Sequence, residues 1–571
     1  MRRIFLKFFL IILPVVAFFC MPALAGAAQI GEQASFFVDS SYDAFSRATL
    51  KATLIIEGEH AYFYVENDWW NGLADPNVAK AAIQDLKNEF DVNVYPKMTK
   101  VYGSLWEPGI DNDPKITILI SRMREGAGGY FNSADEYARN LAANSNEHEM
   151  LYLNSLYFNI TRAKSFLAHE FQHLITFYQK ERLYNKTEDL WLNEARSEYA
   201  PTLLGYDDSL IGSNLEKRII DFLRNPSDSL TEWTNLTVDY GSANLFIQYL
   251  VNHYGEQVLG EIMRSPDVGI ASIDDALTNL NTGVSFADVF HNWMVANNLN
   301  NCGLDQRYCY GSNILDQILI WPTMIQTVPS LGGSEVSFSD SVKDWSGRWY
   351  ELVKGNSNYD KLKIDFQSGG NFTVIYISKN ADGSAQINFI RLDANNKGQG
   401  FVRDFGSKVK SVVLIPISQF KRSFFGSQED THQFSFQASL TNEDLVLPDS
   451  DGSVYPDGAL LRAKGDYKVY VVNGAYKRWI QSSEFFKFYP HLGWASVVEV
   501  APEDLAKYKE TSLVRADGDT KVYEINGDGT KHWLNMTAQQ FSQSGRKWDM
   551  VSIINNAERD FYRTGVNVMF K

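Results

Sequence analysis

The sequence predicts a multidomain α+β protein, and three observations support this fold class. The chain has 571 residues, 44% of them hydrophobic, a length typical of three or four domains with well-filled cores. Apolar residues change from mixed strand and helix spacing to helical spacing near residue 165, and to the alternation of strands near residue 330. The last part of the chain is an internal repeat, which predicts a module built twice.

Residues 1–25 have the pattern of a signal peptide. Three basic residues precede the apolar run Phe8–Cys20, and small residues suited to cleavage follow at Ala23–Ala25. We therefore expect a secreted protein, extracellular or at the cell surface. General secretion fits best; twin-arginine export and an uncleaved anchor are alternatives, although the run is shorter than the roughly 20 residues of a membrane span.

The overall charge argues against a nucleic-acid partner. The chain has a formal net charge of −16, and the signal peptide contains three basic and no acidic residues, so its removal brings the charge to −19. A protein this acidic binds the phosphate backbone poorly. No later stretch is long and apolar enough to cross a bilayer, so we expect no membrane span after signal removal.

Residues 26–325 are predicted to form one catalytic domain with a sheet-rich lobe (26–164) and a helical lobe (165–325). The first lobe has strand-like segments and one amphipathic helix, which are residues 54–56, 62–65, 116–120 and 149–154, and residues 78–90. Asp111-Asn112-Asp113 is a candidate calcium loop, but it is more typical of a turn before Pro114.

The pentapeptide His169-Glu170-Phe171-Gln172-His173 carries the strongest functional signal. It lies in a helical pattern from Phe166 to Tyr178, for which Thr161 or Ser165 is a candidate cap. Residues four apart lie on one face of a helix, so His169 and His173 can bind one ion together, and neutral imidazole suits Zn²⁺. Glu170 would lie beside the open position of the metal, where water is activated. Ordinary polar residues on a half-buried helix are the alternative.

A third ligand is expected because a catalytic zinc usually has three from the protein. Glu194 follows His173 by 21 residues, within WLNEARSE, and a turn-prone polar loop separates the two segments. Glu198 lies four residues later on the same helix face, where it could accept a hydrogen bond from the second nitrogen of His169. A solvated acidic helix face is the alternative for both glutamates.

These motifs resemble those of a known family. HExxH followed by NExxSE is similar to the gluzincin metallopeptidases, the clan of thermolysin and the zinc aminopeptidases, and HEFQH with WLNEARSE is most similar to the secreted hyicolysin-type branch. The resemblance covers roughly residues 35–320. It implies a thermolysin-like catalytic domain, one Zn²⁺ and polypeptide substrates. It also implies Glu194 as third ligand, Glu170 as general base and Glu198 as support for His169, where the thermolysin pattern has Asp.

A second part of the resemblance concerns Tyr240. This tyrosine opens an amphipathic helix that Gly255 ends, and in the clan such a tyrosine hydrogen-bonds the oxyanion of the tetrahedral intermediate. The resemblance therefore implies a catalytic role for Tyr240. A helix-starting tyrosine packed in the core is the alternative.

The glycine-rich stretch 126–131 departs from the aminopeptidase branch. That branch carries a GxMEN stretch that captures the free amine of the substrate, and no Met-Glu-Asn is present here, which favours an endopeptidase. Gly128 and Gly129 follow a predicted strand at Lys115–Ser121 and could let a peptide backbone approach closely. A flexible loop fits these glycines equally well.

The rest of the chain is predicted to lack catalytic groups. Cys302 and Cys309 are the two mature cysteines, and in an exported protein they are expected to form a disulfide. Alternating strands over 330–445 indicate a β-sandwich. Residues 446–458 form a linker, and 459–571 contain two repeats of about 54 residues, since Trp479 corresponds to Trp533.

The sequence thus predicts a secreted zinc-dependent endopeptidase, a hydrolase in which a metal-activated water attacks the peptide bond. Two other hypotheses remain open. A catalytically silent surface or adhesion protein would bind a glycan, cell-wall component or protein through the C-terminal repeats, whose aromatics fit a small core better. Zinc hydrolysis of a non-peptide bond would use the same ligands. Calcium is a second candidate cofactor without support from a complete motif.

Overall fold

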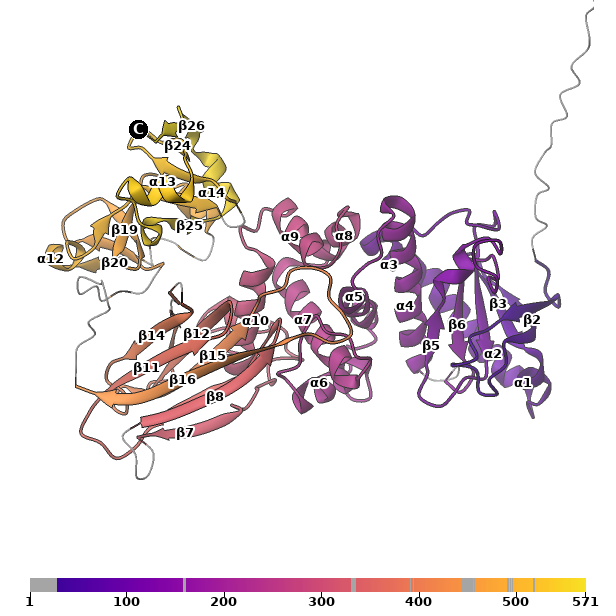
Figure 1. The fold of residues 1–571 in the computed structure, drawn as a ribbon. Coiled ribbons are helices and arrows are strands. Elements are labelled where there is room, and N and C mark those ends of the chain that lie inside the picture. Colours follow the sequence, from indigo (N-terminus) through magenta and orange to yellow (C-terminus); the bar gives the residue numbers. More distant parts are fainter. Residues whose placement is uncertain are drawn as a thin grey trace, which may run out of the picture.

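A computed structural model describes residues 28–157, 161–329, 335–442 and 455–570, apart from 391, 394, 456–457, 490–491, 493, 495–496 and 517–518. The described chain is α+β, with five β-sheets and a central group of helices (Figure 1). The predicted signal peptide and most of the predicted linker lie outside the described residues. Among the helices that are described, none has the length and apolarity that crossing a membrane requires.

The first sheet has the strand order β1-β2-β3-β4-β6-β5. Its strands are β1 (Gln33–Phe37), β2 (Thr49–Glu57), β3 (Ala61–Glu66), β4 (Ile116–Ser121), β5 (Gly129–Phe131) and β6 (Met150–Asn154). Strands β3, β4 and β6 are parallel, whereas β5 pairs antiparallel with β6. Side chains of β3 point alternately into two cores. Phe63 and Val65 pack toward the helices, and Tyr62 and Tyr64 pack on the other face of the sheet.

Helices α2 (Pro76–Glu89) and α4 (Thr161–Thr176) cover one face of this sheet. Leu86 of α2 and Leu167 and Phe171 of α4 share a core with Ile118 of β4. The candidate cap Ser165 is wrong, because it lies four residues inside α4 and is buried. Thr161 is the first residue of the helix. The run continues as a π-helical segment, η3 (Phe177–Arg182).

The helical part follows directly and carries the second half of the candidate site. It comprises α5 (Leu190–Leu203), α6 (Asn214–Arg224), α7 (Thr237–Tyr254), α8 (Gln257–Arg264), α9 (Gly269–Asn279) and α10 (Phe286–Leu299). Helix α7 ends at Gly255, which has φ +77° at the cap, as its position in the sequence predicts.

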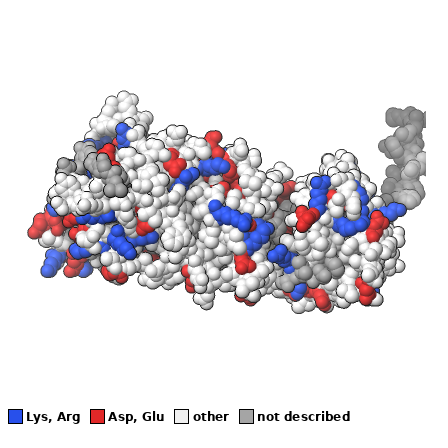
Figure 2. All heavy atoms as spheres, turned by 90° about the horizontal axis from the view of Figure 1, so that it is seen from below, with Lys and Arg blue, Asp and Glu red and all other residues white. Residues whose placement is uncertain are grey.

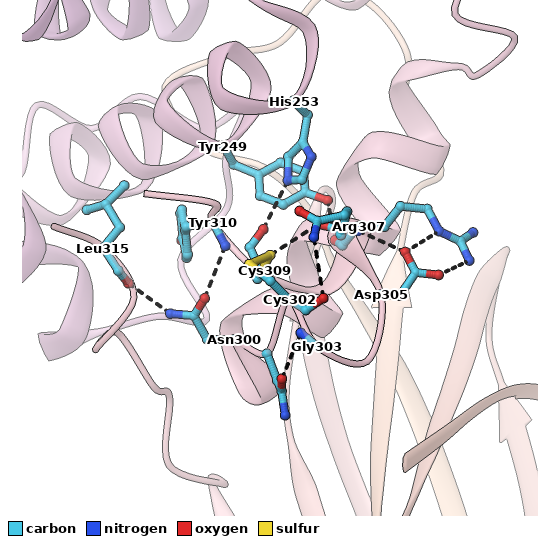
Figure 3. The surroundings of a disulfide bond; sticks show 12 residues. Tyr249, His253, Asn300, Cys302, Gly303, Asp305, Arg307, Cys309, Tyr310 and Leu315 are labelled. Atoms are coloured by element: carbon cyan, nitrogen blue, oxygen red, sulfur yellow. Dashed lines mark hydrogen bonds and ion pairs between the residues drawn. A yellow bond between two sulfur atoms is a disulfide. The ribbon is translucent and has the colours of Figure 1, made fainter. Parts of the chain in front are cut away.

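The disulfide between Cys302 and Cys309 closes a small loop after α10 (Figure 3). The loop is fastened to α7, since the Tyr249 hydroxyl donates to the carbonyl of Arg307 at 2.5 Å and His253 Nε2 lies 3.0 Å from the carbonyl of Cys309. The predicted pairing of the cysteines is confirmed, and its place in the structure is a brace between two helices of the helical part.

Two sheets follow, with the orders β13-β12-β15-β10-β7 and β14-β11-β16-β8. Their strands are β7 (Met324–Val328), β8 (Glu335–Lys343), β10 (Tyr350–Lys354), β11 (Lys361–Ser368), β12 (Phe372–Asn380), β13 (Ala385–Ile390), β14 (Lys397–Val402), β15 (Val409–Ser418) and β16 (Thr431–Thr441). Side chains of both sheets, such as Leu362 and Leu414, meet in one core. Val413 and Ile415 of β15 instead join the core of the helices, so this sheet is buried on both faces.

The C-terminal repeat forms two sheets of the same topology, β20-β17-β18-β19-β21 and β25-β22-β23-β24-β26. The first contains β17 (Leu460–Ala463), β18 (Val469–Asn473), β19 (Tyr476–Ile480), β20 (Val497–Val500) and β21 (Lys509–Glu510). The second contains β22 (Leu513–Ala516), β23 (Val522–Ile525), β24 (Thr530–Asn535), β25 (Ser552–Ile554) and β26 (Arg563–Thr564). A buried ion pair between Arg478 and Glu558, at 2.6 Å, joins the two copies.

The surface seen from below in Figure 2 carries both signs of charge. Lys and Arg side chains are interspersed with Asp and Glu over this face, and neither sign gathers into a continuous patch on it. The net negative charge of the sequence is therefore not concentrated there.

Candidate metal centre

Helices α4 and α5 bring three predicted side chains together. His169 and His173 lie one turn apart on α4, with their Nε2 atoms separated by 3.2 Å. Glu194 of α5 faces both, with Oε2 at 3.3 Å from His169 Nε2 and Oε1 at 3.7 Å from His173 Nε2. The donor atoms of His169, Glu170 and His173 lie within 4.8 Å of one another, so this group could hold a metal ion.

The residues present fit a tetrahedral Zn²⁺. Two ligands bound at 2.0–2.1 Å in a tetrahedron lie about 3.3–3.4 Å apart. The two Nε2 atoms are 3.2 Å apart, and Glu194 Oε2 lies 3.3 Å from His169 Nε2, whereas the other oxygen, Oε1, lies 3.7 Å from His173 Nε2. Glu194 Oε2 is also buried without a hydrogen-bond partner. A buried carboxylate oxygen without a donor is costly, and a cation between the imidazoles would satisfy it. The alternative of a solvated acidic face is wrong for Glu194, whose side chain is 13% exposed.

The second nitrogen of His169 points toward Glu198, as the sequence predicts. His169 Nδ1 lies 3.5 Å from Glu198 Oε1, which favours the tautomer with the proton on Nδ1 and leaves Nε2 free for a metal. Glu198 is itself fully buried. Arg218 of α6 donates two hydrogen bonds to it, at 2.7 and 2.6 Å, and Asn214 donates a third at 2.7 Å. The solvated-face alternative is therefore wrong for Glu198 as well.

Polar side chains that the sequence interpretation missed orient His173. Its Nδ1 lies 3.2 Å from the hydroxyl of Ser197, which donates to Gln172 Oε1 at 2.6 Å. Gln172 in turn donates to Thr176 at 2.9 Å. A hydroxyl whose proton is already committed accepts from Nδ1, so His173 also keeps Nε2 free. Ser197 lies three residues after Glu194, and that spacing could have identified it.

Electrostatics separate the roles of the buried acids. Burial would raise the pKa of Glu198, but the charge of Arg218 outweighs it and holds this pKa at about 2. Burial also opposes ionisation of Glu194, yet the charges of His173 and His169 lower its pKa. For Glu170, burial outweighs the lowering effect of the His169 charge, and the charges of Glu194 and Glu198 add to it, so its pKa rises to about 7. A carboxyl with a pKa near neutrality is suited to accept and release a proton.

The two histidines also differ. Burial lowers the pKa of His173 to about 4. Burial likewise opposes protonation of His169, but the Glu194 carboxylate 3.3 Å from its Nε2, and then the charge of Glu170, raise its pKa to about 9. His169 therefore faces the more negative surroundings of the two.

Gly128 and Gly129 lie at the sheet edge beside Glu170. Gly129 begins β5, which is the outermost strand of the first sheet within the described residues. A Cβ at Gly129 would lie 2.5 Å from the carbonyl oxygen of Tyr152 and 3.1 Å from Glu170 Cγ, and one at Gly128 would lie 2.4 Å from the Phe166 ring. The flexible-loop alternative is wrong for Gly129, and both glycines let the edge strand pack directly on α4.

Tyr240 lies in the first turn of α7 next to this group. Its hydroxyl donates to Asn235 at 3.0 Å, its ring packs 4.7 Å from Trp233, and the Arg218 guanidinium lies 4.5 Å from the ring centre. Burial, and then the charges of Glu194 and Glu198, raise its pKa. The tyrosine is half-buried rather than enclosed in the core.

Tyr42 is a second tyrosine near the group, and no sequence signal pointed to it. It lies between β1 and β2, and its ring packs 4.7 Å from Tyr130 of β5. Burial raises its pKa first, and the charges of Glu170 and Glu194 raise it further. Three separate segments thus lie near the metal group. They contribute Tyr42, Tyr240 and the strand β5.

Comparisons with known proteins leave the site to be interpreted from its own chemistry. No protein-family model and no curated protein matches the chain. Among solved structures, similarity is found to PliG, a periplasmic inhibitor of g-type lysozyme from Aeromonas hydrophila (15% identity, 21% of this chain and 98% of that chain, TM-score 0.15). It is also found to the Yersinia pseudotuberculosis-derived mitogen (12%, 19% and 89%, 0.15) and the pre-peptidase C-terminal domain of collagenase from Bacillus anthracis (8%, 20% and 95%, 0.14). TM-scores this low carry no argument about function.

Proposed function

We propose that the protein is an exported zinc-dependent endopeptidase with a thermolysin-like, gluzincin catalytic domain. The observation that carries this proposal is the convergence of His169, His173 and Glu194 at separations of 3.2–3.7 Å, with Glu170 beside them. Each imidazole has its Nδ1 directed to a protein partner, which leaves both Nε2 atoms for the metal.

A Zn²⁺ held by these three residues would act as a Lewis acid toward water and toward the scissile carbonyl. Glu170 accepts the proton of the attacking water and delivers it to the leaving amine as the C–N bond breaks. Burial, which raises the pKa of this carboxyl in the metal-free site, favours holding the proton between the two transfers. Tyr240 can exchange its exposed partner Asn235 for the developing oxyanion.

Strand β5 offers a place for the substrate backbone. Its outer edge carries no paired strand within the described residues, and an extended peptide can add to such an edge through main-chain hydrogen bonds. Gly129 places this edge against Glu170. Since the stretch around it lacks Met-Glu-Asn, nothing there is built to capture a free amino terminus, which favours cleavage within a chain.

The test compares zinc content and casein hydrolysis of the wild type and E170Q. The variant should keep one zinc per chain and lose roughly 10²–10⁴-fold in activity, the contribution of a general base. E181Q is the matched control, because Glu181 lies on the continuation of the same helix and contacts Tyr137 instead; it should keep both properties. A zinc-loaded wild type that cleaves no protein and no peptide library would overturn the proposal.

A further inference from the structure

A second group of buried acids lies at one end of the strands of the first sheet. Three segments of the chain contribute to this group. Glu136 ends the short 3₁₀ turn η2 (Ser133–Glu136) after β5, and Glu149 immediately precedes β6. Asp111 lies in the turn before β4. Because β4 and β6 run parallel and β5 runs opposite, the start of β4, the start of β6 and the end of β5 meet at the same end of the sheet.

The two glutamates are buried, and three of their four carboxylate oxygens have no hydrogen-bond partner. Glu136 is 1% exposed and Glu149 is 2% exposed. Both carboxylate oxygens of Glu136, and Oε2 of Glu149, have no hydrogen-bond partner. Within the described part of the chain, no Lys or Arg forms an ion pair with either residue. The strongest charges acting on Glu136 come from Glu149, Asp135 and Asp111, which are all acidic.

The neighbouring polar groups are already committed to other partners. Asp135 accepts hydrogen bonds from the backbone N–H of Asn146 at 2.8 Å and from the Tyr152 hydroxyl at 2.7 Å. His148 Nδ1 lies 2.6 Å from Asp111 Oδ2. The side chains of His148 and Asp111 are 39% and 20% exposed, so they form the side of the cluster nearer to solvent.

The turn before β4 is shaped around Glu149. The backbone N–H of Ile110 donates to Glu149 Oε1 at 2.7 Å. A Cβ at Gly109 would lie 1.8 Å from Glu149 Oε2, and Gly109 has φ +82°, a conformation that only glycine adopts readily. The turn thus fixes the carboxylate through one oxygen and leaves the other directed at no donor.

Three buried oxygens without donors require something to neutralise them. A proton shared between the two carboxyl groups would satisfy one oxygen of each and leave one oxygen of Glu136 without a partner. A single hard cation between the two carboxylates would neutralise both charges and could bind oxygens of each. The ligand set contains only oxygen, which suits Ca²⁺ or Mg²⁺ rather than a transition metal.

We propose that Glu136 and Glu149 bind a Ca²⁺ ion at this end of the sheet. Calcium takes six to eight oxygens in flexible geometry, whereas Mg²⁺ demands a regular octahedron and gives up its water reluctantly, so an enclosed pair of carboxylates favours calcium. Backbone carbonyl oxygens and water would complete the shell. The ion would tie η2 and the start of β6 together, and so brace the connection that carries the edge strand β5. The inference does not depend on the peptidase proposal.

Isothermal titration calorimetry of the zinc-loaded full chain with CaCl₂ tests this site. The wild type should show binding of one Ca²⁺, and its thermal midpoint should rise in calcium. E136Q/E149Q should lose both responses, since amides keep the shape and remove the charges. The control E147Q changes a neighbouring acid whose side chain is 38% exposed, and it should retain both.

Two results would overturn the inference. One is a wild type that takes up no Ca²⁺ at millimolar concentration, in which case the glutamates share a proton. The other is equal calcium binding by the wild type and E136Q/E149Q, which would place the ion elsewhere. The first result needs no variant, so it decides the matter even if the double variant does not fold.

Discussion

The molecule contains two buried glutamate pairs that differ in what surrounds them. Glu194 and Glu198 on α5 face two imidazoles, Arg218 and Asn214. The charges nearest to Glu136 are those of further acids, the Ile110 N–H is the donor to Glu149, and three oxygens of the pair have no donor. Glu198, Glu136 and Glu149 are buried and the Glu194 side chain is 13% exposed, so the partners rather than exposure decide the chemistry: the first set suits zinc, and the second suits a hard cation that binds oxygen.

The largest expected effect concerns the first pair. Glu194→Ala removes the carboxylate whose oxygens lie 3.3 Å from His169 Nε2 and 3.7 Å from His173 Nε2, so it should abolish stoichiometric zinc binding. Glu198→Gln removes an outer partner of His169 and should lower zinc affinity roughly 10–100-fold. Zinc titration with a competing chelator measures both. Unchanged occupancy in the alanine variant would remove Glu194 from the ligand set and erase the contrast between the two pairs.

The next effect tests whether Arg218 neutralises Glu198. Arg218→Met leaves a buried carboxylate without its cation, and breaking a buried pair in this way costs about 3–5 kcal/mol of unfolding free energy. Urea denaturation of the zinc-free protein provides the measurement. Arg224→Ala is the control, because Arg224 pairs with Asp221 on the same helix but is 65% exposed, and it should change stability by less than about 0.5 kcal/mol. Equal effects of the two substitutions would contradict this account of Glu198.

The sequence predicted the parts of the site that follow helical spacing. His169, His173, Glu194 and Glu198 lie where residues four apart on two neighbouring helices place them. The strands before them were predicted from short apolar segments, and the strands after residue 330 from alternation. Arg218 could not be found this way, because it comes from α6 and meets Glu198 only through tertiary packing. Tyr42 and the pairing of Glu136 with Glu149 likewise depend on segments that approach one another only in the folded sheet.

The proposed role of Tyr240 predicts a smaller effect than the loss of a ligand. Tyr240→Phe should lower kcat about 10²–10³-fold, the cost of removing one oxyanion donor, while zinc content stays unchanged. Tyr42→Phe removes the hydroxyl of the second tyrosine near the group and serves as the comparison. If Tyr42→Phe lowers kcat as much as Tyr240→Phe, or more, the assignment of the oxyanion donor passes to Tyr42.

The smallest expected effect on stability concerns a third acidic pair, Asp228 and Asp239. Here a bound proton, rather than a cation, reduces the repulsion between the two carboxyl groups. Asp239 accepts from the backbone N–H groups of Thr234 and Leu236 at 2.8 and 2.9 Å, which favours its charged form. Burial, and then the charge of Asp239, raise the pKa of Asp228 to about 7 from 3.8. The folded protein therefore holds a proton that the unfolded chain releases above pH 4, and this contribution to stability is lost as the pH rises through 7.

Between pH 5 and 8 the unfolding free energy of the wild type should fall by roughly 1–3 kcal/mol relative to that of Asp228→Asn, whose amide donates at every pH. Urea denaturation of both proteins at the two pH values measures the difference. A difference that does not change with pH would mean that Asp228 is charged at both, and that this fold tolerates a pair of buried like charges with neither a proton nor a cation between them.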